Sequence, residues 1–519
     1  MFTGKSARAL SFILILILII LSVSAAGILF SCGSQENSQN DGKSNQSENA
    51  AADADGSGDA ETDAAAEAKD IPDPPDLPAR DYGEAEFVIL DRYDPTPGWS
   101  WSNRDVLPTD ETETGEEIND ALFKRNSIVE DKYNIKLERV SFELHLIQQR
   151  LQNSVLSGSN DYDLVMPNFE IGLTASQTGL VADLAQSYPL NLSNPWWNQR
   201  MISETGYQGK IFYAIGDVGI MANDATWILM FNKTLHKDNG LEDIYQIVKD
   251  GKWTMDKFKE MCVDVSRDLN GDGKFDETDM YGIATSDNTI HGMLYGADIK
   301  ISEKDGDGIP QLSLNTEKTV GALEKITEVM YPGNYNAFNF SDWTHIPNCH
   351  LLAQVVFEEN RALFYGEVMQ CVIRLRAMET DFGVIPFPKY DENQKNHAHL
   401  ILSSPASTVA IPSSVSDPEK SALILEELAY QSMIYLTPAY YEQALRGKFI
   451  RDDDSSEMLD IILANRVCDI GYIGGVGNLL GEFTTLVKRG QSDFASMYER
   501  RESAAQKSLD RIIESLSER

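Results

Sequence analysis

The sequence predicts an α/β protein with at least two lobes, each a mostly parallel sheet flanked by helices. From residue 85 onward, short apolar stretches of strand length alternate with amphipathic stretches of helix length, an order that produces parallel sheets covered by helices. The 519 residues exceed what one hydrophobic core usually serves. Hydrophobic residues make up 42% of the chain, which is enough apolar surface for more than one core.

The N-terminal stretch has the pattern of an export signal. Lys5 and Arg8 precede a long apolar run, and the run closes on four residues that resemble a bacterial lipobox: Leu29, Phe30, Ser31 and Cys32. Phe30 departs from the lipobox pattern, in which a small or β-branched residue is commoner. The resemblance implies that residues 1–31 are a signal peptide, removed before Cys32, and that the Cys32 sulfur is diacylated.

Two acyl chains anchor a protein stably where one does not, because each buried methylene contributes about 0.8 kcal/mol. The alternative is an uncleaved transmembrane helix, since residues 9–30 are also long enough to span a bilayer. In both cases we expect the rest of the chain at the outer face of the cell membrane. Residues 32–80 then form a low-complexity acidic linker with almost no large apolar residue, which we expect to be disordered and to act as a tether.

The first folded segments are expected in the order strand, helix, strand, helix, strand, over residues 85–90, 116–133, 135–140, 144–157 and 162–166. A polar, aromatic loop over residues 93–114 carries Trp99 and Trp101. In sheets of this kind, ligands bind beyond the carboxyl ends of the strands. We therefore expect Trp99, Trp101, Asn168 and Glu170 near a cleft.

Four later segments carry a resemblance to a known family: residues 231–233, 357–364, 381–388 and 409–412, the last followed by a helix over 417–430. They read Phe-Asn-Lys, Phe-Glu-Glu-Asn-Arg-Ala-Leu-Phe, Asp-Phe-Gly-Val-Ile-Pro-Phe-Pro and Val-Ala-Ile-Pro. Their order and spacing resemble the extracellular solute-binding proteins of bacterial ABC importers, of the carbohydrate-binding type. No single segment is specific, and the resemblance rests on their order across nearly all of residues 81–519.

The resemblance implies the two-lobed periplasmic-binding-protein fold of type II, with a hinge between the lobes. Lobe 1 would comprise residues 81–224 and 401–430, and lobe 2 residues 225–400, with the C-terminal helical region, 431–519, packed on the outside. The chain would cross between lobes near residues 223–227 and 400–404, and two crossing strands form a hinge. Such a receptor would be a monomer that delivers an oligosaccharide to ABC permease subunits, with a separate ATPase, since no phosphate-cradling Gly-x-x-x-x-Gly-Lys-Ser/Thr motif is present.

Candidate ligand-binding residues follow from sugar chemistry. A sugar has apolar C–H faces that stack on aromatic rings and hydroxyls that need polar partners. The candidates are Trp99, Trp101, Asn168, Asp217, Trp343, Tyr365 and Glu367. In the family, the strand that ends in Tyr365, Gly366 and Glu367 points at the ligand. Any one tryptophan could equally belong to the core or the surface.

Residues 268–279 match an EF-hand-like calcium loop at most of its ligand positions. The expected ligands are Asp268, Asn270, Asp272, Lys274 (through its carbonyl), Asp276 and Asp279. The closing Asp279 is shorter than the usual Glu, and an ion-free Asn-Gly-Asp-Gly turn is the alternative. We expect a structural Ca²⁺ here. Residues 304–309 lack the later ligands and are interpreted as the turn of a hairpin between 299–301 and 311–314.

Composition excludes some functions and leaves others open. The formal net charge of −37 argues against binding to nucleic acid or anionic lipid. The scattered Cys262, Cys349, Cys371 and Cys468 favour free thiols over a disulfide framework. We expect a binding protein and not an enzyme. Two alternatives are a surface glycosidase with paired carboxylates and a calcium-stabilised adhesion module.

Overall fold

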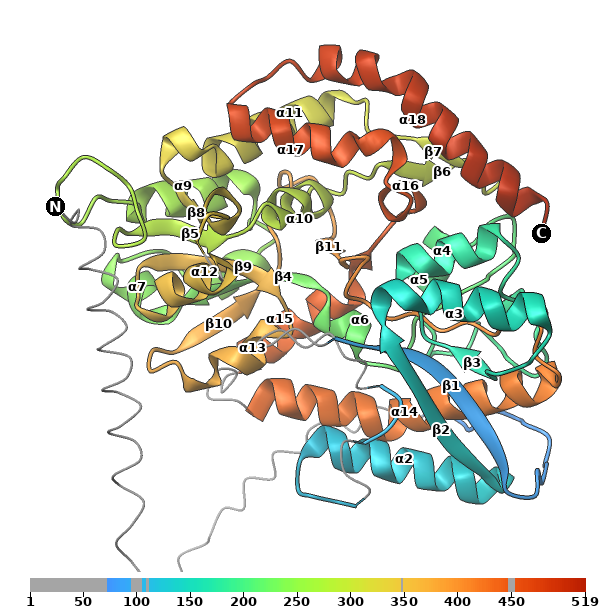
Figure 1. Ribbon diagram of the computed structural model, residues 1–519. Helices are drawn as coiled ribbons and strands as arrows, with labels where there is room; N and C mark the ends of the chain where they lie inside the picture. The colour runs from blue at the N-terminus through green and yellow to red at the C-terminus, as the bar shows by residue number, and fades with distance from the viewer. Residues whose placement is uncertain (1–71, 95–104, 109–111, 347–348, 447–452) are drawn as a thin grey trace, which may run out of the picture. The chain divides into compact units, whose positions relative to one another are not determined.

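The computed structural model describes residues 72–94, 105–108, 112–346, 349–446 and 453–519. The predicted signal peptide, Cys32 and most of the linker lie outside the described residues. From residue 72 onward the described chain belongs to one compact unit, which contains two separate sheets flanked by helices (Figure 1). Within the described residues, none of the helices combines the length and apolar character needed to cross a membrane.

The first sheet is parallel and has the strand order β2-β1-β3. Its central strand β1 (Ala85–Tyr93) pairs with β2 (Ile135–Glu143) along its full length and with the short β3 (Leu164–Val165) near its carboxyl end. The helices α2 (Glu117–Tyr133), α3 (Leu144–Ser157), α4 (Phe169–Gln177) and α14 (Pro418–Arg446) flank this sheet (Figure 1). The predicted order of strands and helices is confirmed, and only β3 is shorter than expected.

The second sheet is mixed, with the order β10-β4-β9-β5-β8. The strand β4 (Trp227–Asn232) is antiparallel to both of its neighbours, β10 (Phe382–Ile385) and β9 (Ala362–Val368). In contrast, β5 (Tyr281–Thr285) is parallel to β9 and to β8 (Ala337–Asn339). The strands β10, β9, β5 and β8 therefore run in the same direction, as expected for a mostly parallel sheet, and β4 alone runs opposite to them.

Helices surround this second sheet. They are α7 (Lys233–Asp238), α8 (Ile244–Lys249), α9 (Met255–Val265), α10 (Asn288–Gly296), α11 (Glu317–Met330), α12 (Cys349–Glu358), α13 (Cys371–Arg374) and α15 (Asp453–Ala464). The predicted hairpin forms from β6 (Ser302–Lys304) and β7 (Pro310–Leu312), a few residues from the expected strands. Its Lys304 Nζ reaches the first half and donates hydrogen bonds to the carbonyls of Ser203 and Gly206.

The two segments that are predicted to cross between the halves lie side by side. Thr226 and Ile401 form an antiparallel bridge, and the Leu402 N–H donates to the Ala225 carbonyl at 3.0 Å. A third segment lies beside them, because β11 (His399–Leu400) pairs in parallel with β12 (Arg466–Val467). This third segment was not predicted. It brings residues near position 470 to the junction between the halves.

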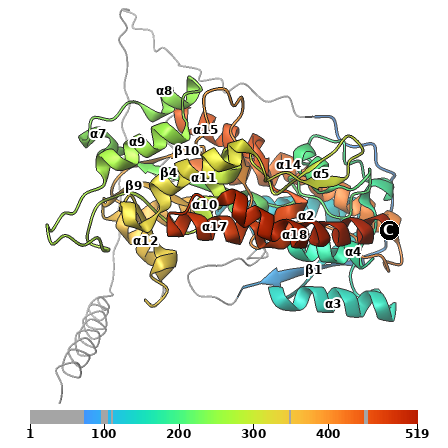
Figure 2. The same ribbon diagram turned by 90° about the horizontal axis from the view of Figure 1, so that it is seen from above.

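The C-terminal region is helical, and its longest helices extend across the molecule. The helix α14 continues without a break past residue 430, through Pro438, to Arg446. The final helix α18 (Phe494–Ser517) extends from α17 (Leu479–Arg489) toward α4 (Figures 1 and 2). At its end the Arg519 guanidinium donates to the Gln177 carbonyl. Both halves therefore contact this region.

The end of the predicted linker lies on the folded body. Residues 72–77 line a small pocket together with Tyr188, Trp196 and Glu426, and Arg80 forms an ion pair with Glu419 on α14. Aromatic rings and prolines pack well together, which accounts for this placement of a segment that is otherwise polar. The folded part begins several residues earlier than residue 81, the predicted start.

Candidate ligand-binding site

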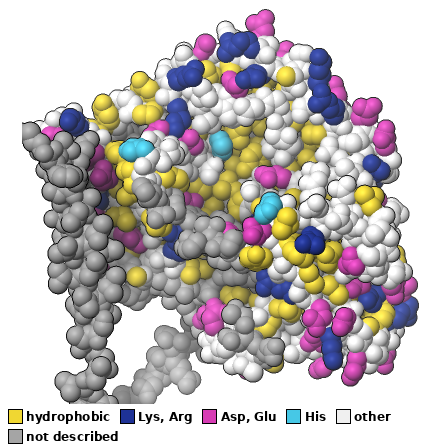
Figure 3. All heavy atoms as spheres, viewed as in Figure 1, with side chains coloured by type: hydrophobic (Ala, Val, Ile, Leu, Met, Phe, Trp, Pro, Cys, Tyr) yellow, Lys and Arg dark blue, Asp and Glu magenta, His cyan; other side chains and the backbone are white. Residues whose placement is uncertain are grey.

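A cavity of about 1370 Å³ lies between the two sheets. In the space-filling view, apolar side chains line a hollow on this face, with carboxylate and histidine side chains around it (Figure 3). The first half contributes residues at or just after the carboxyl ends of β1, β2 and β3: Arg92, Asp94, Glu143, His145, Asn168 and Glu170. The second half contributes Trp227, Ser286, Asn288, His291, Phe340 and Glu367. The crossing segment 402–405 and residues 472–475 complete the wall.

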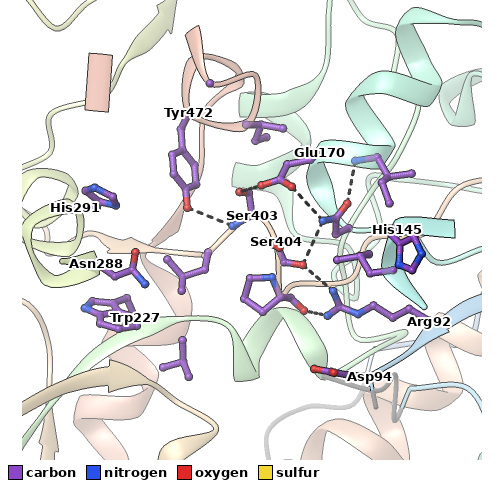
Figure 4. Close-up of a pocket in the computed structure, with 18 of the residues that line it drawn as sticks. Arg92, Asp94, His145, Glu170, Trp227, Asn288, His291, Ser403, Ser404 and Tyr472 are labelled. Carbon is purple, nitrogen blue, oxygen red and sulfur yellow. Dashed lines mark hydrogen bonds between the residues drawn. The ribbon is translucent and has the colours of Figure 1, made fainter. Parts of the chain in front are cut away.

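Arg92 fixes the crossing segment to the first sheet. It lies at the carboxyl end of β1, is 2% exposed, and donates through Nη1 to the Ser404 carbonyl at 2.7 Å and through Nη2 to the Pro405 carbonyl (Figure 4). Burial lowers the pKa of the guanidinium to about 10, against the opposing effect of nearby carboxylates such as Asp105 and Asp94. The side chain remains a cation at neutral pH.

Asn168 and Glu170 form a second link between the first half and the crossing segment. The Asn168 Oδ1 accepts from the Ile171 N–H at 2.9 Å, which caps α4, and its Nδ2 donates to the Ser404 carbonyl at 3.3 Å. The Ser403 hydroxyl donates to Glu170 Oε1 at 2.7 Å (Figure 4). Glu170 is nevertheless exposed and faces the cavity. A ligand that contacts Glu170 would therefore also contact a group bonded to the hinge.

Glu367 is the acidic group of the second half. It lies near the end of β9, is 3% exposed, and accepts a hydrogen bond from the Val368 N–H at 3.0 Å. Burial raises the pKa of its carboxyl group to about 7, while Arg374 acts in the opposite direction. The carboxyl group can therefore gain or lose a proton near neutral pH.

Two further side chains of the second half, Trp227 and His291, lie in the cavity wall. The Trp227 indole N–H donates to the Thr289 hydroxyl at 3.0 Å. His291 Nε2 lies 2.9 Å from the Thr484 hydroxyl, and desolvation lowers the pKa of the imidazole to about 4, so it is neutral at pH 7. Asn288 lies between these two residues and points toward the cavity (Figure 4).

Tyr472 brings an aromatic ring from the C-terminal region into the cavity wall. Its hydroxyl accepts a hydrogen bond from the Ser403 N–H at 3.4 Å, and its ring packs against Tyr295 at 5.7 Å between centroids (Figure 4). The side chain is half-buried and lines the cavity, and burial raises the pKa of its hydroxyl. The prediction that residues 431–519 pack only on the outside of the lobes did not include this contribution.

The structure places two of the seven predicted ligand residues, Asn168 and Glu367, in the cavity wall. Three others lie elsewhere. Asp217 accepts from the Thr437 hydroxyl at 2.8 Å, and burial raises its pKa to about 6. Trp343 stacks on Phe338, with 5.5 Å between the ring centroids. Trp99 and Trp101 lie outside the described residues.

Tyr365 is the third residue that lies away from the cavity. It is fully buried and stacks on Phe357 of α12 at 5.4 Å. Tyr365 and Glu367 belong to the same strand and the same face, but only the position nearer the carboxyl end reaches the cavity. The rule that ligands bind near the carboxyl ends of strands would also have found Arg92 and Asp94, at and just after the end of β1. No local signal marks Tyr472, which the pairing of β11 with β12 brings into place.

The predicted calcium loop is compact and closes on itself. The Asp268 carboxylate accepts from the N–H groups of Gly271 and Gly273 at 2.6 and 2.8 Å, and the Asp279 carboxylate accepts from those of Leu269 and Asp276 at 2.9 Å each. Across the described ranges, no group of three or more His, Cys, Asp or Glu side chains is arranged to hold a metal ion. Calcium binding by this loop stays a prediction from the spacing of its residues.

Comparison with known proteins gives a likeness in structure alone. No family profile matches the sequence, and no curated protein matches it. A cyclic α-maltosyl-1,6-maltose binding protein from Arthrobacter globiformis aligns with a TM-score of 0.56 at 14% identity, covering 83% of this chain and 99% of that one. The ABC substrate-binding protein Lmo0181 from Listeria monocytogenes, solved with cycloalternan, aligns with a TM-score of 0.52 at 14% identity, covering 84% and 99%.

A cyclo/maltodextrin-binding protein solved with maltotetraose also aligns, with a TM-score of 0.52 at 12% identity, covering 87% of this chain and 98% of that one. At sequence identities of 12–14%, these alignments show a shared fold alone. The chain therefore has the two-lobed, periplasmic-binding-protein-like α/β fold, with the cavity between its halves.

Proposed function

We propose that this chain is a membrane-anchored extracellular receptor of an ABC importer, which binds an oligosaccharide non-covalently and delivers it to the permease. The observation that carries the proposal is the cavity, to which both halves, the crossing segment and the C-terminal region all contribute side chains. Each structural relative described above is, by its name, a binding protein for an oligosaccharide or was solved with one. The likeness in fold and the position of the cavity support the same role here.

The chemistry of the cavity wall suits a sugar. Asn288 and Ser286 offer hydrogen-bond donors and acceptors for hydroxyl groups, and Tyr472 and Phe340 offer partly exposed aromatic rings for C–H faces. A cavity of about 1370 Å³ exceeds the roughly 300–1,000 Å³ typical of small-molecule sites, which favours an oligosaccharide over a monosaccharide. A ligand that contacts both halves would shift the population toward the closed state, which the permease would recognise.

Lipid attachment at Cys32 is the second part of the proposal. The basic start, the apolar run and the lipobox-like residues before Cys32 support it. Mass spectrometry of the chain recovered from membranes should find an N-terminal peptide that begins at Cys32 and carries acyl chains, and Cys32→Ser should abolish both the acylation and the cleavage before residue 32. A wild-type chain that retains residues 1–31 and carries no acyl chain would instead favour an uncleaved transmembrane helix.

A thermal-shift screen tests the binding function. The folded chain is heated with neutral oligosaccharides of different lengths and linkages, and the sugars are analysed afterwards for products. A receptor gains thermal stability from its ligand and leaves the ligand intact. Cleavage of the sugar would contradict the proposal and favour a glycosidase. If no sugar in the panel raises the melting temperature, the proposal is contradicted in favour of an adhesion module.

Asn288 gives a sharper test once a ligand is in hand. Asn288→Ala removes a side chain that points into the cavity, and losing one or two hydrogen bonds to a sugar should weaken binding about 10-fold or more. Asn315→Ala is the matched control, because Asn315 is exposed on the surface away from the cavity. Isothermal titration calorimetry measures both, and equal affinities would place the ligand elsewhere.

A further inference from the structure

We infer that this cavity selects uncharged or cationic oligosaccharides and rejects anionic ones, such as oligomers of uronic acids or sulfated sugars. The inference rests on the proposed function and deepens it by naming the charge class of the ligand. It is carried by an imbalance of charge in the cavity wall. Among the described lining residues, the carboxylates are Asp94, Glu143, Glu170 and Glu367, whereas the only lysine or arginine is Arg92.

The carboxylates occupy both sides of the cavity. Asp94, Glu143 and Glu170 lie at or just after the carboxyl ends of the strands of the first sheet, and Glu367 lies near the end of β9 in the second. A ligand held between the halves therefore meets negative charge from the first half, and from both halves once Glu367 is ionised. Glu170 is exposed to the cavity, so its charge acts on the ligand directly, even though one oxygen accepts from Ser403.

Arg92 does not offset these carboxylates for a ligand. Both of its terminal nitrogens donate to backbone carbonyls of the crossing segment, and the side chain is 2% exposed. Its positive charge is also shared with Asp91 and Asp105, two carboxylates that are not among the lining residues. The two terminal nitrogens of the guanidinium are therefore bonded to the crossing segment. They are not available to form a bidentate ion pair with a carboxylate or sulfate of a sugar.

The two histidines of the wall do not supply the missing cation. His291 is neutral at pH 7 and lies beside the Thr484 hydroxyl. His145 is exposed at the opposite side of the cavity, where its Nδ1 lies 3.5 Å from a carboxylate oxygen of Glu143. An anionic sugar would thus lose its hydration without gaining an ionic partner among the described residues of the wall.

The expected discrimination is large enough to measure. At an effective dielectric constant of about 20, one like charge at about 6 Å weakens binding by about 100-fold before screening by salt. Physiological salt reduces this effect, because the Debye length is about 8 Å. We therefore expect an anionic trisaccharide to bind at least about tenfold more weakly than its neutral counterpart. The cationic counterpart should bind at least as tightly as the neutral one.

The test compares glucose, glucuronic acid and glucosamine trisaccharides, in one α-linked and one β-linked series, by calorimetry at low and physiological salt. The wild-type chain should bind the uronic acid compound most weakly, with the larger difference at low salt. Glu170→Gln and Glu367→Gln should each lower the ratio of neutral to anionic affinity severalfold. Glu324→Gln is the control for charge removed from the exposed surface of α11, and it should leave that ratio unchanged.

The outcomes separate the two proposals. A uronic acid trisaccharide that binds as tightly as the glucose compound, or a ratio unchanged by both cavity variants, would overturn the charge selection and leave the receptor function standing. If none of the three sugars binds in either the α-linked or the β-linked series, the oligosaccharide receptor function is overturned, and the charge selection with it. Weak anionic binding that both variants improve would support the inference.

Discussion

Replacing Glu367 with glutamine should stabilise the folded chain above neutral pH. The wild-type carboxyl group is 3% exposed and accepts one hydrogen bond, from the Val368 N–H, so its ionised form is poorly solvated. Glutamine has nearly the same shape and retains an oxygen for that hydrogen bond, but it carries no charge. The substitution therefore removes the cost of burying the charge and leaves the packing around β9 in place.

The magnitude follows from the pKa of this group. In the folded chain burial raises the pKa of Glu367 to about 7, whereas the ordinary value is 4.5. Each tenfold change in proton affinity corresponds to about 1.36 kcal/mol, so the ionised form costs the fold about 3 kcal/mol. The folded state binds more protons than the unfolded state between pH 4.5 and 7. The wild-type chain therefore loses this stability as the pH rises through 7, and loses none of it below pH 4.5.

The assay is thermal unfolding of wild-type and variant chains at pH 4.5 and pH 8. At about 1 kcal/mol per degree for a folded body of this size, Glu367→Gln should raise the melting temperature by about 3 °C at pH 8 and by almost nothing at pH 4.5. The exposed Glu324→Gln should show no such pH dependence. A Glu367→Gln variant with the same shift at both pH values, or with none, would refute the argument that burial destabilises the ionised form.

Two further predictions concern stability away from Glu367. Asp469 is fully buried and accepts from Ser302 N–H and Oγ at 3.0 and 2.9 Å, from the Tyr295 hydroxyl and from the Tyr472 N–H, so Asp469→Asn should cost about 2–3 kcal/mol and lower the urea midpoint. An unchanged midpoint would show that these bonds are replaced by water. If the loop at residues 268–279 binds Ca²⁺ with a Kd of about 10⁻⁴ M, removing 1 mM free Ca²⁺ with a chelator should cost about 1.4 kcal/mol, or 1–2 °C in melting temperature. No change on chelation would leave the loop as an ion-free turn.

Local segments of the fold could be predicted because their signals lie within a few residues. The helix Leu144–Ser157 has the predicted bounds, and Glu116 caps the helix that follows it, as the switch from a polar loop to an apolar stripe predicts. The strand β1 is buried where the apolar run 85–90 predicts a core strand. The direction of β4 could not be predicted, since it depends on which neighbours β4 acquires and not on its own residues.

The candidate site residues also divide into those that could be predicted from the sequence and those that could not. Asn168 and Glu367 were predicted because they follow or end strands, and strand ends gather at one edge of a sheet. Tyr365, two positions before Glu367 on the same strand, is covered by Phe357, which lies on a helix eight residues earlier in the chain. Whether a strand residue is covered depends on how deep in the folded body it lies. The alternation of side chains along a strand does not predict this depth.

The sequence by itself determined the alternation of strands and helices, because the spacing of apolar residues is a property of neighbouring positions. The export and lipid signal that we propose also rests on neighbouring residues. Only the tertiary structure decided that Tyr472 faces the cavity, since the pairing of His399–Leu400 with Arg466–Val467 brings it there. The same holds for Arg92, whose charge is bound to backbone carbonyls more than 300 positions away. The physical reason is that the charge a ligand meets depends on which side chains are already paired, and pairing over such distances exists only in the folded chain.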